Sequence, residues 1–120
     1  MTVIDIFTIG AGGFLGAVIR YFISGKFNKD GRALPFGTLF VNIAGSLLIG
    51  FVAGLGVTKP WTLFLVSGFA GAFTTFSTLT KELLQFWIGK RKKQFFIYLF
   101  LTYGIGIIMA FVGFLVGNAW

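Results

Sequence analysis

The chain has 120 residues, of which 57% are hydrophobic and only 11% are charged, and its net charge is +7. Soluble domains carry about 25% charged residues, so this composition excludes an ordinary water-soluble domain. The sequence contains no cysteine and no histidine, which excludes disulfide scaffolds, Cys or His metal sites and catalysis by a thiol or an imidazole. The serine and threonine hydroxyls have no base to activate them, and we expect the protein not to be an enzyme.

Long uncharged stretches divide the chain. Residues 33–58, 60–80 and 94–120 carry no charge. A transmembrane helix needs about 20 predominantly apolar residues, and the nearly continuous apolar character does not fit the alternation of a transmembrane β-barrel. We therefore expect an all-α membrane protein whose residues 1–120 form a single four-helix transmembrane domain, with spans at roughly 3–24, 34–57, 61–88 and 94–118.

The cations gather on one side of this arrangement. Four spans place both termini on one side of the membrane, and the loops at 24–33 and 89–93 on the other. Cytoplasmic loops carry an excess of Lys and Arg, so we expect these loops in the cytoplasm, both termini outside, and the protein in the inner membrane of a prokaryote. Nucleic acid, which +7 would suggest for a soluble protein, is not an expected partner. Only Lys59 lies on the side of the termini, and the other nine cations are Arg20, Lys26, Lys29, Arg32, Lys81, Lys90, Arg91, Lys92 and Lys93.

Span one contains one arginine and the first of several closely spaced glycine pairs. Arg20, near the end of the span, either extends its charge to the membrane interface or supplies a positive field at the mouth of a water-filled vestibule that attracts anions. Glycines four residues apart let helix backbones approach closely, within the four-helix unit or against a second copy. Such pairs recur in three spans: Gly12 and Gly16, Gly50 and Gly54, and Gly113 and Gly117.

Span two carries an amide at mid-membrane depth. Asn42 must find hydrogen-bond partners there, because an unpaired polar group in the bilayer is costly. Two interpretations remain open: a hydrogen bond between helices, or donation from its NH2 group to a permeating anion. Ser46 lies one turn further along on the same face.

Span three combines glycines with a run of hydroxyls. Five of the seven residues from Thr74 to Thr80 are Ser or Thr, and glycine and threonine both weaken a helix. We expect a helix break near residues 71–75, although an unbroken, threonine-rich packing face is the alternative. Broken membrane helices expose carbonyls that coordinate cations and helix N-termini that favour anions. Phe76 lies among these hydroxyls, and the positive edge of its ring suits a small, strongly hydrated anion.

Three stretches resemble the signature motifs of the Fluc/CrcB family of fluoride channels: residues 12–21 (GGFLGAVIRY), 37–46 (GTLFVNIAGS) and 68–78 (GFAGAFTTFST). The length, the four spans and the charge placement match as well, so the resemblance covers the whole chain. It implies a fluoride-selective channel that passively exports cytoplasmic fluoride and confers fluoride resistance. It also implies an antiparallel dimer with two pores and a structural sodium ion at its centre.

Carried over by position in the motifs, the family's functional roles fall on residues of the three stretches. The resemblance implies that backbone carbonyls of Gly71 and Thr74 hold the sodium ion and that Arg20 lies in the vestibule. The pore and its polar track would be lined by Asn42, Phe76, Ser77 and Thr78.

Leu79 departs from the family pattern, which has a second phenylalanine at this position. In the family each pore uses the first phenylalanine of one subunit and the second of the other, and leucine offers no ring edge. Homodimeric members carry little charge bias, whereas this chain has nine cations on one side and one on the other. We therefore hypothesise that the antiparallel partner is a paralogue rather than a second copy.

Two other functions fit the same four spans. One is a non-conducting or half-pore subunit of a heterodimeric fluoride channel, an alternative that Leu79 keeps open. The other, more remote, is a small multidrug transporter, whose proton coupling needs a carboxylate inside the membrane. Asp5 and Glu82 both lie toward span ends, which argues against this alternative.

Overall fold

The computed structural model describes residues 2–27 and 34–120, and every regular element in these ranges is helical. The predicted loop at 24–33 falls partly outside these ranges, with Lys29 and Arg32. The elements in chain order are α1 (Val3–Phe27), α2 (Phe36–Leu55), α3 (Lys59–Thr62), the π-helical η1 (Leu63–Ala70), α4 (Gly71–Phe73), α5 (Phe76–Ile88), α6 (Lys92–Phe100), the π-helical η2 (Leu101–Ile105) and α7 (Gly106–Asn118).

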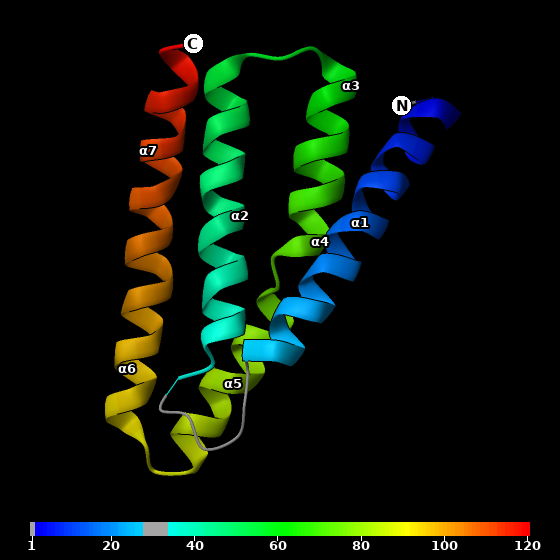
Figure 1. Ribbon diagram of the computed structural model, residues 1–120. Coiled ribbons are helices and arrows are strands. Elements are labelled where there is room, and N and C mark those ends of the chain that lie inside the picture. Colours follow the sequence, from blue (N-terminus) through cyan, green and yellow to red (C-terminus); the bar gives the residue numbers. More distant parts are fainter. Residues whose placement is uncertain (1, 28–33) are drawn as a thin grey trace.

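These elements join into four helical spans, which confirms the prediction of an all-α membrane protein. The helices long and apolar enough to cross a membrane are Val3–Lys26, Phe36–Leu55, Lys59–Ile88 and Lys92–Asn118. The beginning of α1 and the C-terminus lie at the same end of the molecule, and the turn between α5 and α6 lies at the opposite end (Figure 1). Two exposed tryptophans, Trp61 in α3 and Trp120, lie at the first end, whereas Trp87 lies near the α5–α6 turn. Tryptophan is enriched at both membrane–water interfaces, so this placement marks the two faces of the membrane.

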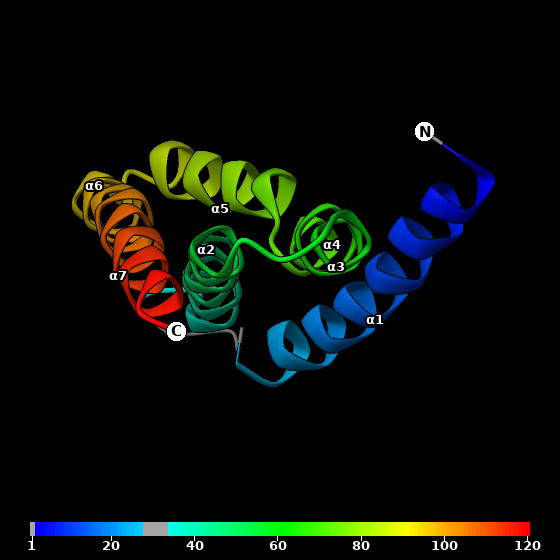
Figure 2. The same ribbon diagram turned by 90° about the horizontal axis from the view of Figure 1, so that it is seen from above.

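The third span changes direction at its break. Seen from above, α3 and α4 form one column beside α1, and α5 runs away from it toward α6 (Figure 2). The third span therefore consists of two half-helices with different axes. Because the span changes direction here, the end of α5 lies against α6 and the break faces α2.

Glycines allow the helices to approach closely within one subunit. A Cβ atom on Gly50 would collide with the Ala110 carbonyl of α7, and one on Gly113 would collide with the Leu47 carbonyl of α2. Gly12 lies in the same way against the Phe64 carbonyl of η1. Of the two interpretations of these glycines, the structure therefore accounts for these positions by packing inside the four-helix unit.

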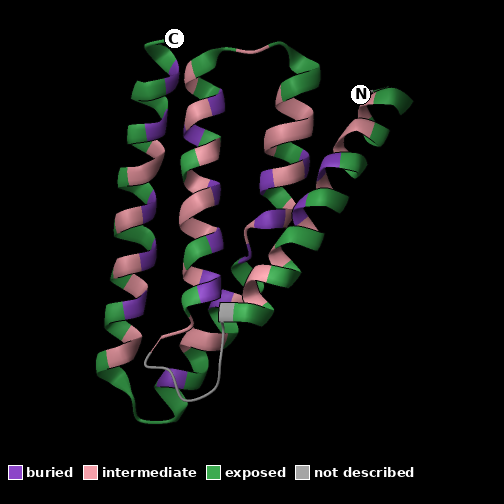
Figure 3. Ribbon diagram, viewed as in Figure 1, coloured by how far each residue is buried: buried purple, intermediate pink, exposed green. Residues whose placement is uncertain are grey.

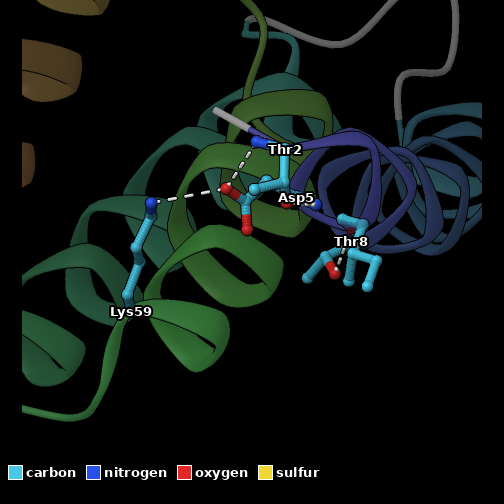
Figure 4. A network of polar contacts seen from close by, with 5 residues as sticks. Thr2, Asp5, Thr8 and Lys59 are labelled. Atoms are coloured by element: carbon cyan, nitrogen blue, oxygen red, sulfur yellow. Dashed lines mark hydrogen bonds and ion pairs between the residues drawn. The ribbon is translucent and has the colours of Figure 1, made fainter.

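A polar network holds the start of α1 near α3 (Figure 4). The Asp5 amide donates to the Thr2 hydroxyl at 3.1 Å, and the Thr2 amide donates to Asp5 Oδ2 at 3.0 Å. This reciprocal pattern is a capping box. The same carboxylate oxygen lies 3.3 Å from Lys59 Nζ, so the lone cation on the side of the termini pairs with the acid of span one.

Little of the chain is buried inside the single subunit. Much of α1 and the outer faces of α6 and α7 are exposed (Figure 3), and the buried apolar side chains are few: Val41, Val52, Ala70, Phe73, Leu79, Phe86 and Tyr98. In a membrane, exposed apolar side chains contact lipid tails or another membrane subunit. The fold is thus a thin layer of helices arranged around the break in span three.

Candidate functional site

The helix break lies at Thr74 and Thr75. Both residues have extended backbone angles, with φ −80° and ψ 159° at Thr74 and φ −145° and ψ 119° at Thr75. The α4 helix ends at Phe73 and α5 begins at Phe76, which confirms the break predicted near residues 71–75. Non-helical backbone at membrane depth must find new hydrogen-bond partners, and the neighbouring side chains provide them.

Asn42 of α2 supplies two of these partners. Its Nδ2 donates to the Thr75 carbonyl at 3.1 Å, and its Oδ1 accepts from the Thr75 amide at 2.8 Å. The side chain thereby pairs with both polar groups of one extended residue, as a neighbouring strand would. This geometry agrees with the first interpretation of Asn42, a hydrogen bond between helices. An amide nitrogen carries two protons, so one proton is left for a further acceptor.

Thr75 in turn caps the second half-helix. Its hydroxyl accepts from the Thr78 amide at 3.2 Å, which is the standard arrangement of a threonine N-cap. Thr74 turns back instead, and its hydroxyl donates to the Ala70 carbonyl at 2.8 Å. The two threonines at the break therefore stabilise opposite half-helices.

These side-chain bonds redirect the amides that would complete a continuous helix. In an unbroken α-helix the Thr75 amide donates to the Gly71 carbonyl and the Thr78 amide donates to the Thr74 carbonyl. Here the first donates to Asn42 and the second to the Thr75 hydroxyl. The carbonyls of Gly71 and Thr74 thus lose their usual helical donors.

A groove of about 330 Å³, here called the Phe76 groove, lies between α2, the break and the fourth span. Asn42, Phe76 and Leu79 line it together, so the structure brings three of the predicted pore residues to one place. Ile49, Gly106, Ile107 and Ala110 make up its apolar remainder. The polar lining consists of neutral side chains, namely those of Asn42, Ser46, Thr74, Thr75, Thr102 and Tyr103.

Arg20 lies in a different depression, here called the Arg20 hollow, of about 360 Å³. Tyr21, Ser24 and Gly25 of α1 line it together with Thr75 and Thr78. Arg20 Nε is buried and has no hydrogen-bond partner among the described residues. Because Thr75 lines both depressions, the break lies between the guanidinium and the Phe76 groove. Ser77 is exposed and lines neither of them.

Phe76 and Leu79 differ sharply in exposure although they are three residues apart. Phe76 is 72% exposed in the single subunit, whereas Leu79 is 3% exposed and packs with Phe86 and Tyr98. An exposed ring beside a polar groove is available to a ligand or to a second subunit. The Leu79 side chain reaches the groove wall but belongs mainly to the small core beneath it.

Polar residues outside the predicted site also surround this core. Glu82 accepts from the Tyr98 hydroxyl at 2.9 Å and from the Thr38 hydroxyl at 3.3 Å, which joins α2, α5 and α6. Thr102 is buried and its hydroxyl has no hydrogen-bond partner among the described residues. The sequence could have drawn attention to these residues only as an acid and isolated hydroxyls within apolar spans. The hydrogen-bond partners of Glu82 lie far away in sequence, so the sequence could not identify them.

Comparison with known proteins agrees with this architecture. Residues 7–114 match the family described as CrcB-like protein, Camphor Resistance (CrcB). A fluoride-specific ion channel FluC 2 of Bacillus cereus is 43% identical over 116 residues, which cover 96% of this chain and 98% of the relative.

Relatives named FluC 1 match over similar lengths. One from Listeria innocua is 38% identical over 118 residues, covering 95% of this chain and 98% of the relative. Another from Geobacillus kaustophilus is 40% identical over 110 residues, covering 92% and 95%. Each of these relatives is named as an ion channel and not as an enzyme or a multidrug transporter. With its four apolar helices and its match from residue 7 to residue 114, the chain belongs to the CrcB family of bacterial integral membrane proteins.

Proposed function

We propose that this chain is a subunit of a fluoride-selective channel that exports cytoplasmic fluoride passively across the inner membrane and so confers fluoride resistance. The observation that best supports this proposal is the break at Thr74 and Thr75, which Asn42 holds beside the exposed ring of Phe76. The curated relatives are named fluoride-specific ion channels, which supports fluoride as the permeating ion.

The Phe76 groove has the chemistry that fast passage of fluoride requires. A small, hard anion must exchange its water shell for donors, yet must also leave, so binding has to be favourable without being too tight. The groove offers hydroxyl and amide donors and the ring of Phe76, and among the described residues no charged side chain lines it. Arg20, on the other side of Thr75, would raise the local anion concentration without binding the ion inside the groove.

In this proposal Asn42, Phe76, Ser77 and Thr78 serve the pore, and Leu79 forms part of its wall. Asn42 would use one amide proton to hold Thr75 and the other to contact fluoride. Thr78 lines the Arg20 hollow and would contribute to the approach. Ser77 is exposed in the single subunit, so its contribution requires the second subunit.

We also propose the structural sodium ion at the dimer centre, held by the carbonyls of Gly71 and Thr74. Sodium is a hard cation that accepts backbone oxygens as ligands, and discontinuous membrane helices commonly provide such oxygens. The supporting observation is that Asn42 and Thr75 take the amides that would otherwise bond to these carbonyls. Gly71 is exposed in the single subunit, as a ligand shared with a second subunit has to be.

The second subunit in this proposal is an antiparallel paralogue. Leu79 leaves each pore of a homodimer without its second ring, and the uneven distribution of cations favours one insertion direction, with both termini outside and the loops at 24–33 and 89–93 in the cytoplasm. A half-pore or non-conducting role beside that paralogue is the second candidate, and the burial of Leu79 against Phe86 and Tyr98 favours it.

Electrode-monitored fluoride efflux from liposomes tests the proposal. The chain is reconstituted alone and together with a FluC paralogue from the same genome. We expect strong efflux from the mixed sample and little from the chain alone. Robust efflux from an antiparallel homodimer would refute the paralogue requirement, and absence of fluoride efflux from both samples would refute the channel function.

Substitution of Phe76 separates the two candidate roles. In the mixed assembly, a conducting subunit loses efflux on Phe76→Ile, whereas a non-conducting subunit does not. Size-exclusion chromatography of the complex shows whether the variant still assembles with the partner's unaltered chain.

A further inference from the structure

The turn between α5 and α6 carries a surface that the proposed fluoride pathway does not use. Lys90, Arg91, Lys92 and Lys93 follow one another there, and all four are exposed. Trp87 and Phe96 flank them and are 45% and 46% exposed. We propose that this basic–aromatic surface, consisting of residues 90–93 with Trp87 and Phe96, binds the phosphate headgroups of anionic phospholipids.

The described residues do not neutralise the lysines of this surface. Lys90, Lys92 and Lys93 form no ion pair with a described residue. The two acids in the described ranges are engaged elsewhere: Asp5 pairs with Lys59, and Glu82 accepts from Tyr98 and Thr38. These three lysines are therefore not ion-paired within the described ranges and can meet a ligand from outside the chain.

Aromatic rings contact two of the four cations of the surface, Arg91 and Lys92. Lys92 Nζ lies 4.7 Å from the centre of the Trp87 ring, and the Arg91 guanidinium lies 4.8 Å from that of Phe86. Trp87 in turn packs edge-on against Phe95 at 5.2 Å between ring centres, and Phe95 against Phe96 at 5.2 Å. These contacts connect the charges to a continuous ring cluster across α5 and α6, so the charges are fixed at the level of the aromatic belt.

The length of the fourth span places this surface at the headgroups. Residues 92–118 form one continuous helical span, which at about 1.5 Å per residue extends about 40 Å. The hydrocarbon core is about 30 Å thick, so roughly two turns lie outside it. Trp120 marks the opposite interface, and the first turns of α6 therefore reach the layer of lipid phosphates.

The backbone of the turn spreads the cations apart. Lys90 adopts the left-handed conformation with φ 59°, and Arg91 precedes the first turn of α6. The chain reverses there, so the four side chains cannot follow a single helix face. Clusters of four or more Lys and Arg next to a membrane helix attract anionic lipids, and the reversal offers charges to more than one headgroup.

If these charges served only to orient the chain, they would be needed only while the chain inserts into the membrane. The proposal requires more, namely that anionic lipid is enriched around this turn in the folded protein. A single-tryptophan variant measures this enrichment directly. Trp61→Phe with Trp120→Phe leaves Trp87 as the sole reporter, and the protein is reconstituted in phosphatidylcholine containing a minor fraction of acyl-chain-brominated phosphatidylglycerol or brominated phosphatidylcholine.

We expect brominated phosphatidylglycerol to quench Trp87 beyond its share of the bilayer, by about fivefold for each cation that reaches a headgroup, and high salt to reduce the effect. Replacing Lys90, Lys92 and Lys93 by Gln should reduce this preference to at most the share of Arg91, while Lys92→Arg should keep it. Both vesicle leaflets have the same lipid composition, so a change in insertion direction does not alter the result.

The other end of the molecule supplies the matched control. Trp87→Phe with Trp120→Phe leaves Trp61, two residues from Lys59, whose Nζ pairs with Asp5, and we expect no preference for phosphatidylglycerol there. Equal quenching at both ends, or quenching unchanged by the Lys→Gln replacements, would overturn the proposal. Stronger competition by inorganic phosphate than by chloride at equal ionic strength would overturn it too, because it would assign a site for free phosphate.

Discussion

Asn42 pairs with both backbone polar groups of Thr75, at 3.1 Å and 2.8 Å, and thereby fixes the break in the third span from a neighbouring helix. The two residues are 33 positions apart. One side chain thus connects the geometry of the break to the packing of α2, and also lines the Phe76 groove. The Asn42 amide thus holds the break and, in the proposed function, also contacts the permeating ion.

Asn42→Asp separates the two hydrogen bonds of this pair. The carboxylate keeps an acceptor for the Thr75 amide but places an oxygen opposite the Thr75 carbonyl, so we expect a loss of stability of about 1–3 kcal/mol. Its charge also repels an anion, and fluoride efflux should fall strongly. Thermal unfolding and liposome efflux measure the two effects. Asn118→Asp is the matched control, because Asn118 is exposed at the end of α7 and lines neither the Phe76 groove nor the Arg20 hollow; wild-type behaviour of Asn42→Asp in both assays would contradict this account.

Phe76→Ile removes the ring from the groove while preserving an apolar side chain. We expect fluoride efflux through the pore that uses Phe76 to fall strongly and the stability of the subunit to change little, because the ring is 72% exposed. Phe7, which is 73% exposed at the far end of α1, provides the control substitution Phe7→Ile. Comparable losses in both variants would argue against a specific role for the Phe76 ring.

Thr102→Val tests the unpartnered hydroxyl in the groove. The substitution keeps the shape of the side chain and removes a buried polar atom without a partner among the described residues, so stability should be unchanged or raised by about 1 kcal/mol. Efflux should nevertheless fall if the hydroxyl donates to the ion. Thr8→Val, whose hydroxyl donates to the Ile4 carbonyl, controls for loss of a threonine hydroxyl; unchanged efflux in Thr102→Val would exclude Thr102 from the pathway.

Sodium should stabilise the assembled protein. An ion that binds only the native assembly adds about 2.7 kcal/mol at a hundred times its dissociation constant, so the melting temperature should be higher in sodium chloride than in N-methylglucamine chloride. Potassium chloride controls for ionic strength. Identical melting temperatures in the three salts would remove the proposed site at the carbonyls of Gly71 and Thr74.

Gly113→Ala probes the contact between α7 and α2. The new methyl group would meet the Leu47 carbonyl, and we expect a loss of about 1–3 kcal/mol because overpacking forces the helices apart. A Cβ atom on Gly104, on the same span, has no neighbour within 4 Å, so Gly104→Ala should be tolerated. Equal stability of the two variants, measured by thermal unfolding in detergent, would show that the close approach contributes little.

The spans and the site of the break could be predicted from the amino-acid pattern alone. Hydropathy along the chain is a local property, and twenty apolar residues in a bilayer have few alternatives to a helix. The cause of the break is also a local property of the sequence, because the glycines and hydroxyls that weaken the helix are neighbours in sequence. The residues 68–78 therefore predicted the position where the third span opens, and together with residues 12–21 and 37–46 they indicated the family.

The contacts that these residues make depend on how the helices pack. The structure shows that Asn42 pairs with Thr75, that Leu79 joins the core of Phe86 and Tyr98, and that Thr102 shares a groove with Phe76. Composition and spacing cannot specify such pairs, because each depends on how a distant helix is placed beside the break. A polar group in a membrane must be paired, so the sequence could require a partner for Asn42, but the packing of α2 against the third span selected Thr75.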